Sequence, residues 1–329
     1  MKNWLKLPID KQIDLFNQLS AKTGIQPQAI EKDAWVTLIL RMIFNSEISE
    51  FLVFKGGTSL SKAYNLIERF SEDIDISLDR KFLGFEGNIS KGEIRKLRKE
   101  SHKFVSTQMI EIIRKRFENH DIKKELFQIE VENTKISDQD PEIITINYQS
   151  VFDELTYIPK RVLIEIGARS LMEPIEQREI VSIIEENYPG SPFSEGKFAV
   201  NTIIPEKTFL EILILLHEEF QKPKEKIRYH RMSRHLYDIG QIITTEYGQK
   251  ALADEDLFNK IIAHRELFMP IKTVDYKKLR LKGLRIIPPD DFLELYRKDY
   301  VEMQENMIYG KSLGFYELME LLNVKYAEN

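Results

Sequence analysis

Two aspartates separated by one residue stand in the apolar segment "DIDISL", residues 73–78. The alternation of acidic and apolar residues predicts a strand, and side chains two positions apart on a strand project to the same face. Asp73 and Asp75 are then about 6–7 Å apart along the backbone. Two such carboxylates repel each other unless a cation or donors lie between them. Mg²⁺ suits an all-oxygen site of this kind. The alternative is an exposed edge strand with two solvated aspartates.

Two adjacent glycines, Gly56 and Gly57, follow a short apolar segment that we expect to be a strand. Thr58 and Ser59 come next and are available to cap a helix, which the apolar spacing over residues 60–67 predicts. Glycine lets the backbone approach a ligand closely, and a helix N-terminus offers N–H groups to phosphate. The segment is neither a Walker P-loop nor a G-x-G-x-x-G motif. It predicts a phosphate cradle beside a divalent-metal site, as two-metal phosphoryl or nucleotidyl transfer requires.

The joint pattern "FKGGTSLSKAY…RFSEDIDI" resembles motif I of the polymerase-β-like nucleotidyltransferases, in the form found in the AbiEii/AbiGii toxin family. Later blocks of that family are matched in order by "RVLIEIGAR", "IPEKTFLEILILL" and "RYHRMSRHLYDI", and "IEKDAWVTLIL" is similar to its N-terminal helix. The resemblance covers roughly residues 25–245. It implies a nucleotidyltransferase fold, binding of a nucleoside triphosphate with Mg²⁺, and the toxin role in a two-gene type IV toxin–antitoxin or phage-defence system. It also implies action on nucleic acid, including the acceptor ends of tRNA.

An acidic residue, Glu165, interrupts the apolar segment "VLIEIG", whose valine and isoleucines alternate to the opposite face of a strand. A glutamate is rarely found in so apolar a strand unless it has a partner or a specific role. We expect Glu165 to be the third carboxylate of the metal site, or a base toward an attacking hydroxyl. The alternative is an edge-strand glutamate that pairs with Arg161 or Arg169.

Lysines near the expected phosphates form another group. Lys207 follows Pro205 in the first turn of a very apolar helix, where the helix dipole disfavours a cation. The resemblance implies a required lysine in this block, with triphosphate binding as its role. A solvated lysine is the alternative. Lys62 is a further candidate charge partner of the phosphates.

The segment "RYHRMSRHLYDI" predicts one helix that carries Arg231 and Asp238 on the same side, two turns apart. Arginine suits phosphate because its donors form a planar fork. The family usually has an acid where this chain has His235, which leaves the role of that position open, while Asp238 matches. The alternative is an ion pair between Arg231 and Asp238 within the helix.

The composition is that of a globular chain of 329 residues with a net charge of −5 and no cysteine, which excludes disulfides and thiolate metal sites. The N-terminus lacks the apolar run of a signal peptide, and no apolar stretch reaches the ~20 residues of a membrane span, so we expect a cytoplasmic protein without a membrane partner. Lysine and arginine nevertheless outnumber acids in residues 91–124, 222–235 and 272–285. These runs are either solvated helix faces or a surface for a polyanion.

Apolar periodicity predicts strands at residues 51–55, 73–78, 126–133, 143–150 and 161–168. It predicts helices at 9–20, 28–44, 91–118, 205–220, 228–246, 255–268, 290–307 and 312–324. The predicted fold is α/β or α+β, a polymerase-β-like core sheet flanked by helices. We expect residues 1–200 to form the nucleotidyltransferase domain with its N-terminal helices, and residues 201–329 a helical domain that completes the nucleotide site.

The resulting hypothesis is transfer of a nucleotide from an NTP to an RNA acceptor, the 3′ end of tRNA, with release of pyrophosphate. Two Mg²⁺ ions are expected on Asp73, Asp75 and Glu165, and the phosphates on residues 56–59. The resemblance also implies a cognate antitoxin, encoded by a neighbouring gene, as a partner. The alternatives are phosphoryl or nucleotidyl transfer to a protein partner, or a nucleotide-binding interaction module without turnover.

Overall fold

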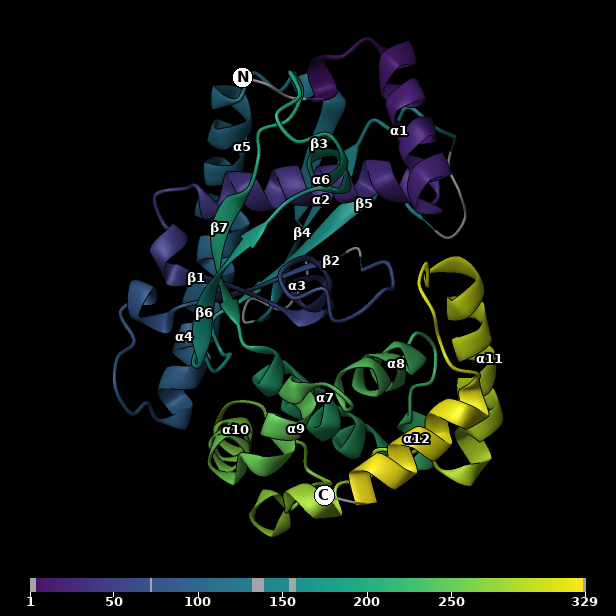
Figure 1. The fold of residues 1–329 in the computed structure, drawn as a ribbon. Helices are drawn as coiled ribbons and strands as arrows, with labels where there is room; N and C mark the ends of the chain where they lie inside the picture. The colour runs from purple at the N-terminus through teal and green to yellow at the C-terminus, as the bar shows by residue number, and fades with distance from the viewer. Residues whose placement is uncertain (1–3, 72, 132–138, 154–157, 328–329) are drawn as a thin grey trace. The chain divides into compact units, whose positions relative to one another are not determined.

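The computed structural model describes residues 4–71, 73–131, 139–153 and 158–327 (Figure 1). Its chain divides into two compact units. Unit 1 comprises residues 1–63 and 71–202, and unit 2 comprises residues 64–70 and 203–329. The functional roles that we assign to an N-terminal and a C-terminal domain remain predictions.

Unit 1 is built on a mixed seven-stranded sheet of order β3-β4-β5-β2-β1-β7-β6. The strands are β1 (Leu52–Lys55), β2 (Asp73–Leu78), β3 (Phe127–Val131), β4 (Glu142–Tyr148), β5 (Arg161–Gly167), β6 (Ile175–Ile180) and β7 (Phe198–Ile203). The pairs β1/β2, β3/β4 and β4/β5 are antiparallel, whereas β2/β5 and β1/β7 are parallel. This sheet with its helices confirms the predicted fold class.

The sequence pattern located β1 to β5 to within a few residues, but the last two residues of the predicted strand 126–133 lie outside the described residues. It missed β6 and β7. Strand β6, "IEQREI", is at one edge of the sheet and alternates between exposed and partly buried positions. Four polar residues among six give it no apolar face, so hydrophobic periodicity could not detect it.

The helices of unit 1 are α1 (Ile9–Thr23), α2 (Pro27–Phe44), α3 (Gly56–Lys62), α4 (Lys91–Phe104), α5 (Ile110–Asn119) and α6 (Ile183–Asn187). Helix α2 packs against β2 and β5 and is buried on all sides, which explains why its sequence is apolar without a strong polar stripe. The predicted basic helix 91–118 is α4 and α5, joined by the π-helical turn η4 (Val105–Met109).

The predicted helix over residues 60–67 is wrong in its second half, because α3 ends at Lys62. Asn65 has the left-handed φ of 53°, a conformation that stops a helix. Residues 64–70 instead belong to unit 2, where Arg69 forms a β-bridge with Ile308 and the Phe70 N–H donates to Met307 O at 2.7 Å. Long-range pairing has overridden the local apolar pattern.

Unit 2 is helical, with α7 (Pro205–Phe220), α8 (Ser233–Ile242), α9 (Glu246–Ala253), α10 (Glu255–Phe268), α11 (Asp290–Asn306) and α12 (Phe315–Ala327). Short 3₁₀ turns occur in both units: η1 (Trp4–Lys6), η2 (Ser49–Phe51), η3 (Arg80–Leu83), η5 (Lys124–Leu126), η6 (Lys224–Lys226), η7 (Tyr276–Lys278) and η8 (Leu281–Gly283). The predicted helix 228–246 is shorter than expected, since residues 228–232 precede α8 in an ordered loop. No helix among the described residues is long and apolar enough to cross a membrane.

Candidate active site

Three carboxylates share one face of two neighbouring strands. β2 and β5 run parallel, and their register pairs Asp75 directly with Glu165 and Asp73 with Leu163. Directly paired residues project to the same face of a sheet, and Asp73 shares that face with Asp75 by alternation. Both strands lie inside the sheet, so the edge-strand alternatives for these acids are wrong. Arg169, a partner considered for Glu165, pairs with Asp140 at 2.7 Å.

The opposite face of these strands explains why their sequence alternates. Ile74, Ile76, Ile164 and Ile166 are all fully buried, while the three acids are only partly buried. Burial of four isoleucines contributes roughly 1.5–3 kcal/mol each and fixes the register. A slip by one residue would place the acids in the core. The hydrophobic pattern therefore fixes the positions of Asp73, Asp75 and Glu165 on the opposite face of the sheet.

Gly56 lies directly beside the carboxylate of Asp75. Gly56 has a φ of 77°, and a Cβ built on it would lie 2.1 Å from Asp75 Oδ2. Both observations require glycine: the backbone is left-handed, and the carboxylate occupies the space of a side chain. The start of α3 is thus packed directly against one carboxylate of the acidic face.

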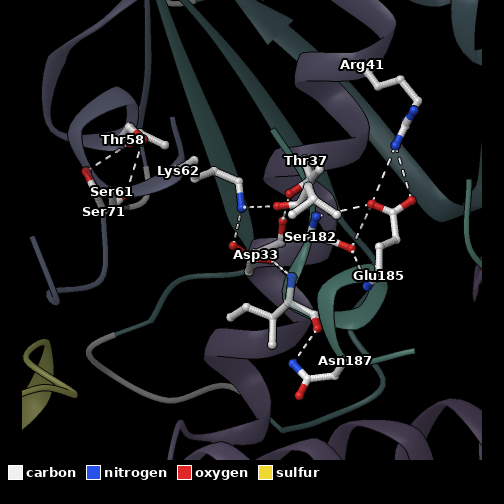
Figure 2. A network of polar contacts seen from close by, with 12 residues as sticks. Asp33, Thr37, Arg41, Thr58, Ser61, Lys62, Ser71, Ser182, Glu185 and Asn187 are labelled. Carbon is white, nitrogen blue, oxygen red and sulfur yellow. Dashed lines mark hydrogen bonds and ion pairs between the residues drawn. The ribbon is translucent and has the colours of Figure 1, made fainter. Parts of the chain in front are cut away.

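The hydroxyls of Thr58 and Ser59 do not cap α3, and that prediction is wrong. Lys55 is the N-cap residue and makes no side-chain cap. Thr58 Oγ1 instead donates to Asp73 O and accepts from Ser71 Oγ (2.9 Å), and Ser59 Oγ donates to Gly56 O at 2.8 Å. Figure 2 shows Thr58 beside Ser71. These bonds tie α3 to β2, and they leave the backbone N–H groups of the first helical turn as the donors available to an anion.

Lys62, on the last turn of α3, forms an ion pair with Asp33 of α2 (Figure 2). Asp33 also accepts from the Ile183 N–H at 2.9 Å, and Lys62 Nζ lies 3.4 Å from Val181 O. The side chains of Lys62 and Asp33 are only 8% and 12% exposed. The charge of Lys62 is thus matched by a carboxylate that sequence reasoning did not single out, although an aspartate inside so apolar a helix was a signal.

A second buried ion pair continues this network along α2. Arg41, two turns beyond Asp33, donates to Glu185 of α6 at 3.1 Å. Ser182 caps α6 in a capping box with Glu185, and both are buried. Figure 2 shows the two ion pairs along the same helix. They fix the turn between β6 and α6 that holds Lys62.

In unit 2, Lys207 is fully buried and pairs with Glu211 one turn along α7, at 3.2 Å. A solvated lysine is therefore excluded. A lysine without solvent exposure needs anionic partners, since burial of an ammonium is otherwise costly.

Arg231 and Asp238 do not share a helix, which corrects the prediction. Arg231 precedes α8 with a φ of 58°, whereas Asp238 lies inside α8 and accepts two bonds of 2.7 Å from Arg69. Asp238 is 1% exposed. Its fixed guanidinium partner comes from residues 64–70, a segment of unit 2 that begins within the predicted helix 60–67 and extends beyond it.

His235, at the position that is usually acidic in the family, is a packing residue. Its Nδ1 is buried and accepts no hydrogen bond from the described residues. Burial, with the nearby charges of Arg234, Arg69 and Arg228, places its pKa well below the ordinary value of 6.5. A neutral imidazole cannot replace a carboxylate as a ligand of a hard cation.

The donor set on the acidic face fits a divalent cation by its chemistry, since it consists of carboxylates alone. Within the part of the chain that the structure describes, no three His, Cys, Asp or Glu side chains are arranged to hold a metal ion. The predicted site residues fall into two sets. Residues 56–59, Lys62 and the three acids belong to unit 1, and Lys207, Arg231 and Asp238 belong to unit 2.

The pairing of Asp75 with Glu165 across two strands, with Gly56 packed beside Asp75, is the arrangement expected of a nucleotidyltransferase. The chain belongs to the AbiEii family, the nucleotidyl transferase toxins of type IV toxin–antitoxin systems, whose model matches residues 38–324. It is therefore a nucleotidyltransferase toxin. The family implies a nucleoside triphosphate substrate, a divalent metal and an antitoxin partner.

Two solved structures are similar in fold. The nucleotidyltransferase toxin MenT4 of Mycobacterium tuberculosis is 14% identical, with a TM-score of 0.45, over 94% of this chain and 98% of that one. JHP933 of Helicobacter pylori is 14% identical, with a TM-score of 0.44, over 91% and 90% of the two chains. Comparison with curated proteins gives no match.

Proposed function

We propose that the protein transfers a nucleoside monophosphate from an NTP to the 3′ end of an RNA, with tRNA as the acceptor, and that it depends on Mg²⁺. The observation that carries this proposal is the register of β2 and β5, which pairs Asp75 with Glu165 beside Asp73. Metal ions bound by these carboxylates would stabilise the negative charge on the attacking oxygen and on the departing pyrophosphate. We further propose that the protein serves in phage defence, with an antitoxin encoded by a neighbouring gene.

The carboxylates Asp73, Asp75 and Glu165 are the residues that would hold two Mg²⁺ ions. Bound there, the ions would supply charge neutralisation of the reacting phosphate. Glu165 can also accept the proton of the attacking hydroxyl, as a general base within the same face. The acceptor oxygen forms a bond to the α-phosphorus while the bond to the bridging oxygen breaks, and pyrophosphate leaves with its electron pair.

Candidate phosphate-binding residues are found in each unit. Gly56, Gly57, Thr58 and Ser59 would bind the β- and γ-phosphates through the backbone N–H groups of α3. Lys207 and Arg231 would supply positive charge in unit 2, as the family resemblance implies.

Lys62 and Asp238 are proposed to position other groups rather than to contact the substrate. Lys62, paired with Asp33, orients α3, and Asp238 orients Arg69. Each ion pair is buried, so the loss of one partner would leave an uncompensated charge and disturb the local structure.

The test is incubation of the full chain with total RNA and each of the four α-labelled NTPs, with Mg²⁺ present or removed by chelation. We expect label in RNA of tRNA size, stoichiometric pyrophosphate release, and loss of both in Asp75→Asn. Label in protein would favour transfer to a protein partner. NTP binding without pyrophosphate release would favour a binding module, and either result would refute the proposal.

A further inference from the structure

The loop between α7 and α8, residues 221–232, is a basic segment with a defined conformation. It carries five lysines and arginines against one acid, Glu225. Lys224, Lys226, Tyr229 and His230 are exposed, while Ile227 and Met232 are buried and anchor the loop to unit 2. Lys224 forms an ion pair with Asp291 of α11 in which both side chains are exposed, so a phosphate would displace that carboxylate from Lys224. The segment otherwise presents its charges on an ordered backbone.

A buried carboxylate holds the first half of this loop. Glu219, in the last turn of α7, is 1% exposed and accepts from the Arg228 N–H (2.8 Å), from Arg228 Nη2 (2.7 Å) and from Lys222 Nζ (2.7 Å). Tyr296 of α11 donates to Arg228 O at 2.8 Å. The guanidinium of Arg228 is neutralised on one side, yet its side chain remains 62% exposed.

A second buried carboxylate holds the other half. Asp299 of α11 accepts from the backbone N–H of Arg231 and from the backbone N–H of Ser233, the latter at 2.9 Å. The Met232 N–H closes a turn on Tyr229 O at 3.0 Å. Arg231 occupies this turn with a φ of 58°, where glycine is normally required.

The strained turn carries three exposed residues: Tyr229, which is 43% exposed, His230, whose side chain is 77% exposed, and Arg231. A solvated basic loop needs neither a left-handed arginine nor two buried carboxylates to hold its backbone. Strain of about 1–3 kcal/mol is retained where the surrounding structure and function require it. An exposed aromatic ring among cations is the combination that binds unpaired nucleotides, by stacking on the base and contact with phosphates.

We propose that residues 224–230 form a binding surface for the single-stranded 3′ end of the RNA acceptor, with Tyr229 stacking on a base and Lys224 and Lys226 contacting phosphates. This proposal rests on the proposed function, because it specifies how that acceptor is bound. The loop continues directly into Arg231, the residue proposed to bind the triphosphate, so one short segment would contact both acceptor and nucleotide.

The experiment compares Tyr229→Ala with Tyr229→Phe in the full chain, with unfractionated deacylated tRNA as the probe. Stacking is worth a 5- to 160-fold difference in affinity at ~1–3 kcal/mol per base, so Tyr229→Ala should weaken tRNA binding by about that factor. Tyr229→Phe keeps the ring and should retain affinity. The matched control is Tyr316→Ala, since Tyr316 is 66% exposed on α12 of the same unit. Tyr316→Ala should leave binding unchanged.

The phosphate contacts are tested by the salt dependence of tRNA binding. The double variant Lys224→Gln/Lys226→Gln should reduce the slope of log K against log [KCl] by about 1.4, at ~0.7 per phosphate of a single strand. The control Lys22→Gln/Lys260→Gln removes two exposed charges outside the basic runs and should keep the slope.

Unchanged tRNA affinity in a folded Tyr229→Ala, or an equal loss in Tyr316→Ala, would overturn this proposal. The KM for NTP, measured as pyrophosphate release, should not change in the Tyr229 variants, and a change would also contradict it. Failure of the wild-type protein to label any RNA is a different result, which refutes the proposed function itself.

Discussion

Replacement of Gly56 by alanine should destabilise the protein and abolish nucleotide transfer, for two separable reasons. First, the new side chain sits on a backbone with a φ of 77°, which costs an L-residue about 1–2 kcal/mol. Second, its Cβ would lie 2.1 Å from Asp75 Oδ2, where ordinary contacts begin at 3.4 Å. The carboxylate must therefore move by about 1.3 Å, the difference of the two distances.

The movement of Asp75 has an energetic and a functional part. A side chain forced off its rotamer costs of the order of 0.5–1.5 kcal/mol. Together with the backbone cost, Gly56→Ala should lower the free energy of unfolding by about 1.5–3.5 kcal/mol. Because the displaced group belongs to the acidic face that would hold the metal, transfer should fall below detection while the protein remains folded.

Gly24→Ala is the matched control. Gly24 ends α1 with a φ of 75°, and no atom lies within 4 Å of a Cβ built there. It should therefore lose only about 1–2 kcal/mol and keep wild-type transfer. Urea unfolding of both variants, with pyrophosphate release on the same preparations, separates the backbone cost from the contact with Asp75.

A double-mutant cycle with Asp75→Ala isolates that contact. Without the carboxylate only Asp75 Cβ remains near, at 3.1 Å, so Gly56→Ala should then cost less than it does in the wild-type background. A coupling energy of about 1 kcal/mol or more is expected for residues in contact. Equal losses for Gly56→Ala and Gly24→Ala, no coupling, or wild-type activity in Gly56→Ala would refute the reasoning.

Three further predictions use the same assays. Glu165→Gln should reduce turnover at least 100-fold with little change in thermal stability, since a neutral amide removes a metal ligand or base but keeps the shape; activity that survives would remove Glu165 from the site. Arg231→Gly should relieve the left-handed strain and stabilise the protein by about 1 kcal/mol, yet raise the KM for NTP roughly tenfold or more, because a charged contact to phosphate is lost; a lower stability would contradict the strain. Burial and the charge of Arg285 lower the pKa of His217, whose Nδ1 accepts the Arg285 N–H at 2.8 Å. The unfolded chain therefore binds more protons below about pH 6.5, so the free energy of unfolding should fall as pH drops below that value, and His217→Gln should flatten the dependence.

The acidic face was predictable because its signals are local. Alternation along β2 and β5 placed the acids opposite buried isoleucines, and burial then left a single register. The partners of the cations were not predictable in this way. Lys62 meets Asp33 across 29 positions of sequence, and Arg69 meets Asp238 across 169. Hydrophobic periodicity carries no information on contacts between residues so far apart in sequence, so the pairing of Arg69 with Asp238 could not be predicted.

Preorganisation gives these distant carboxylates a functional meaning. Ordering a long side chain on binding costs about 0.5–1.5 kcal/mol, and a side chain that is already fixed does not incur that cost again. Lys62 is fixed by Asp33, Arg228 by Glu219, and the backbone of Arg231 by Asp299. In each case an acid that cannot itself bind phosphate holds a basic residue in one conformation. The net charge of −5 is therefore compatible with anion binding. Some of the acidic residues that make the net charge negative are the same ones that hold basic residues in position.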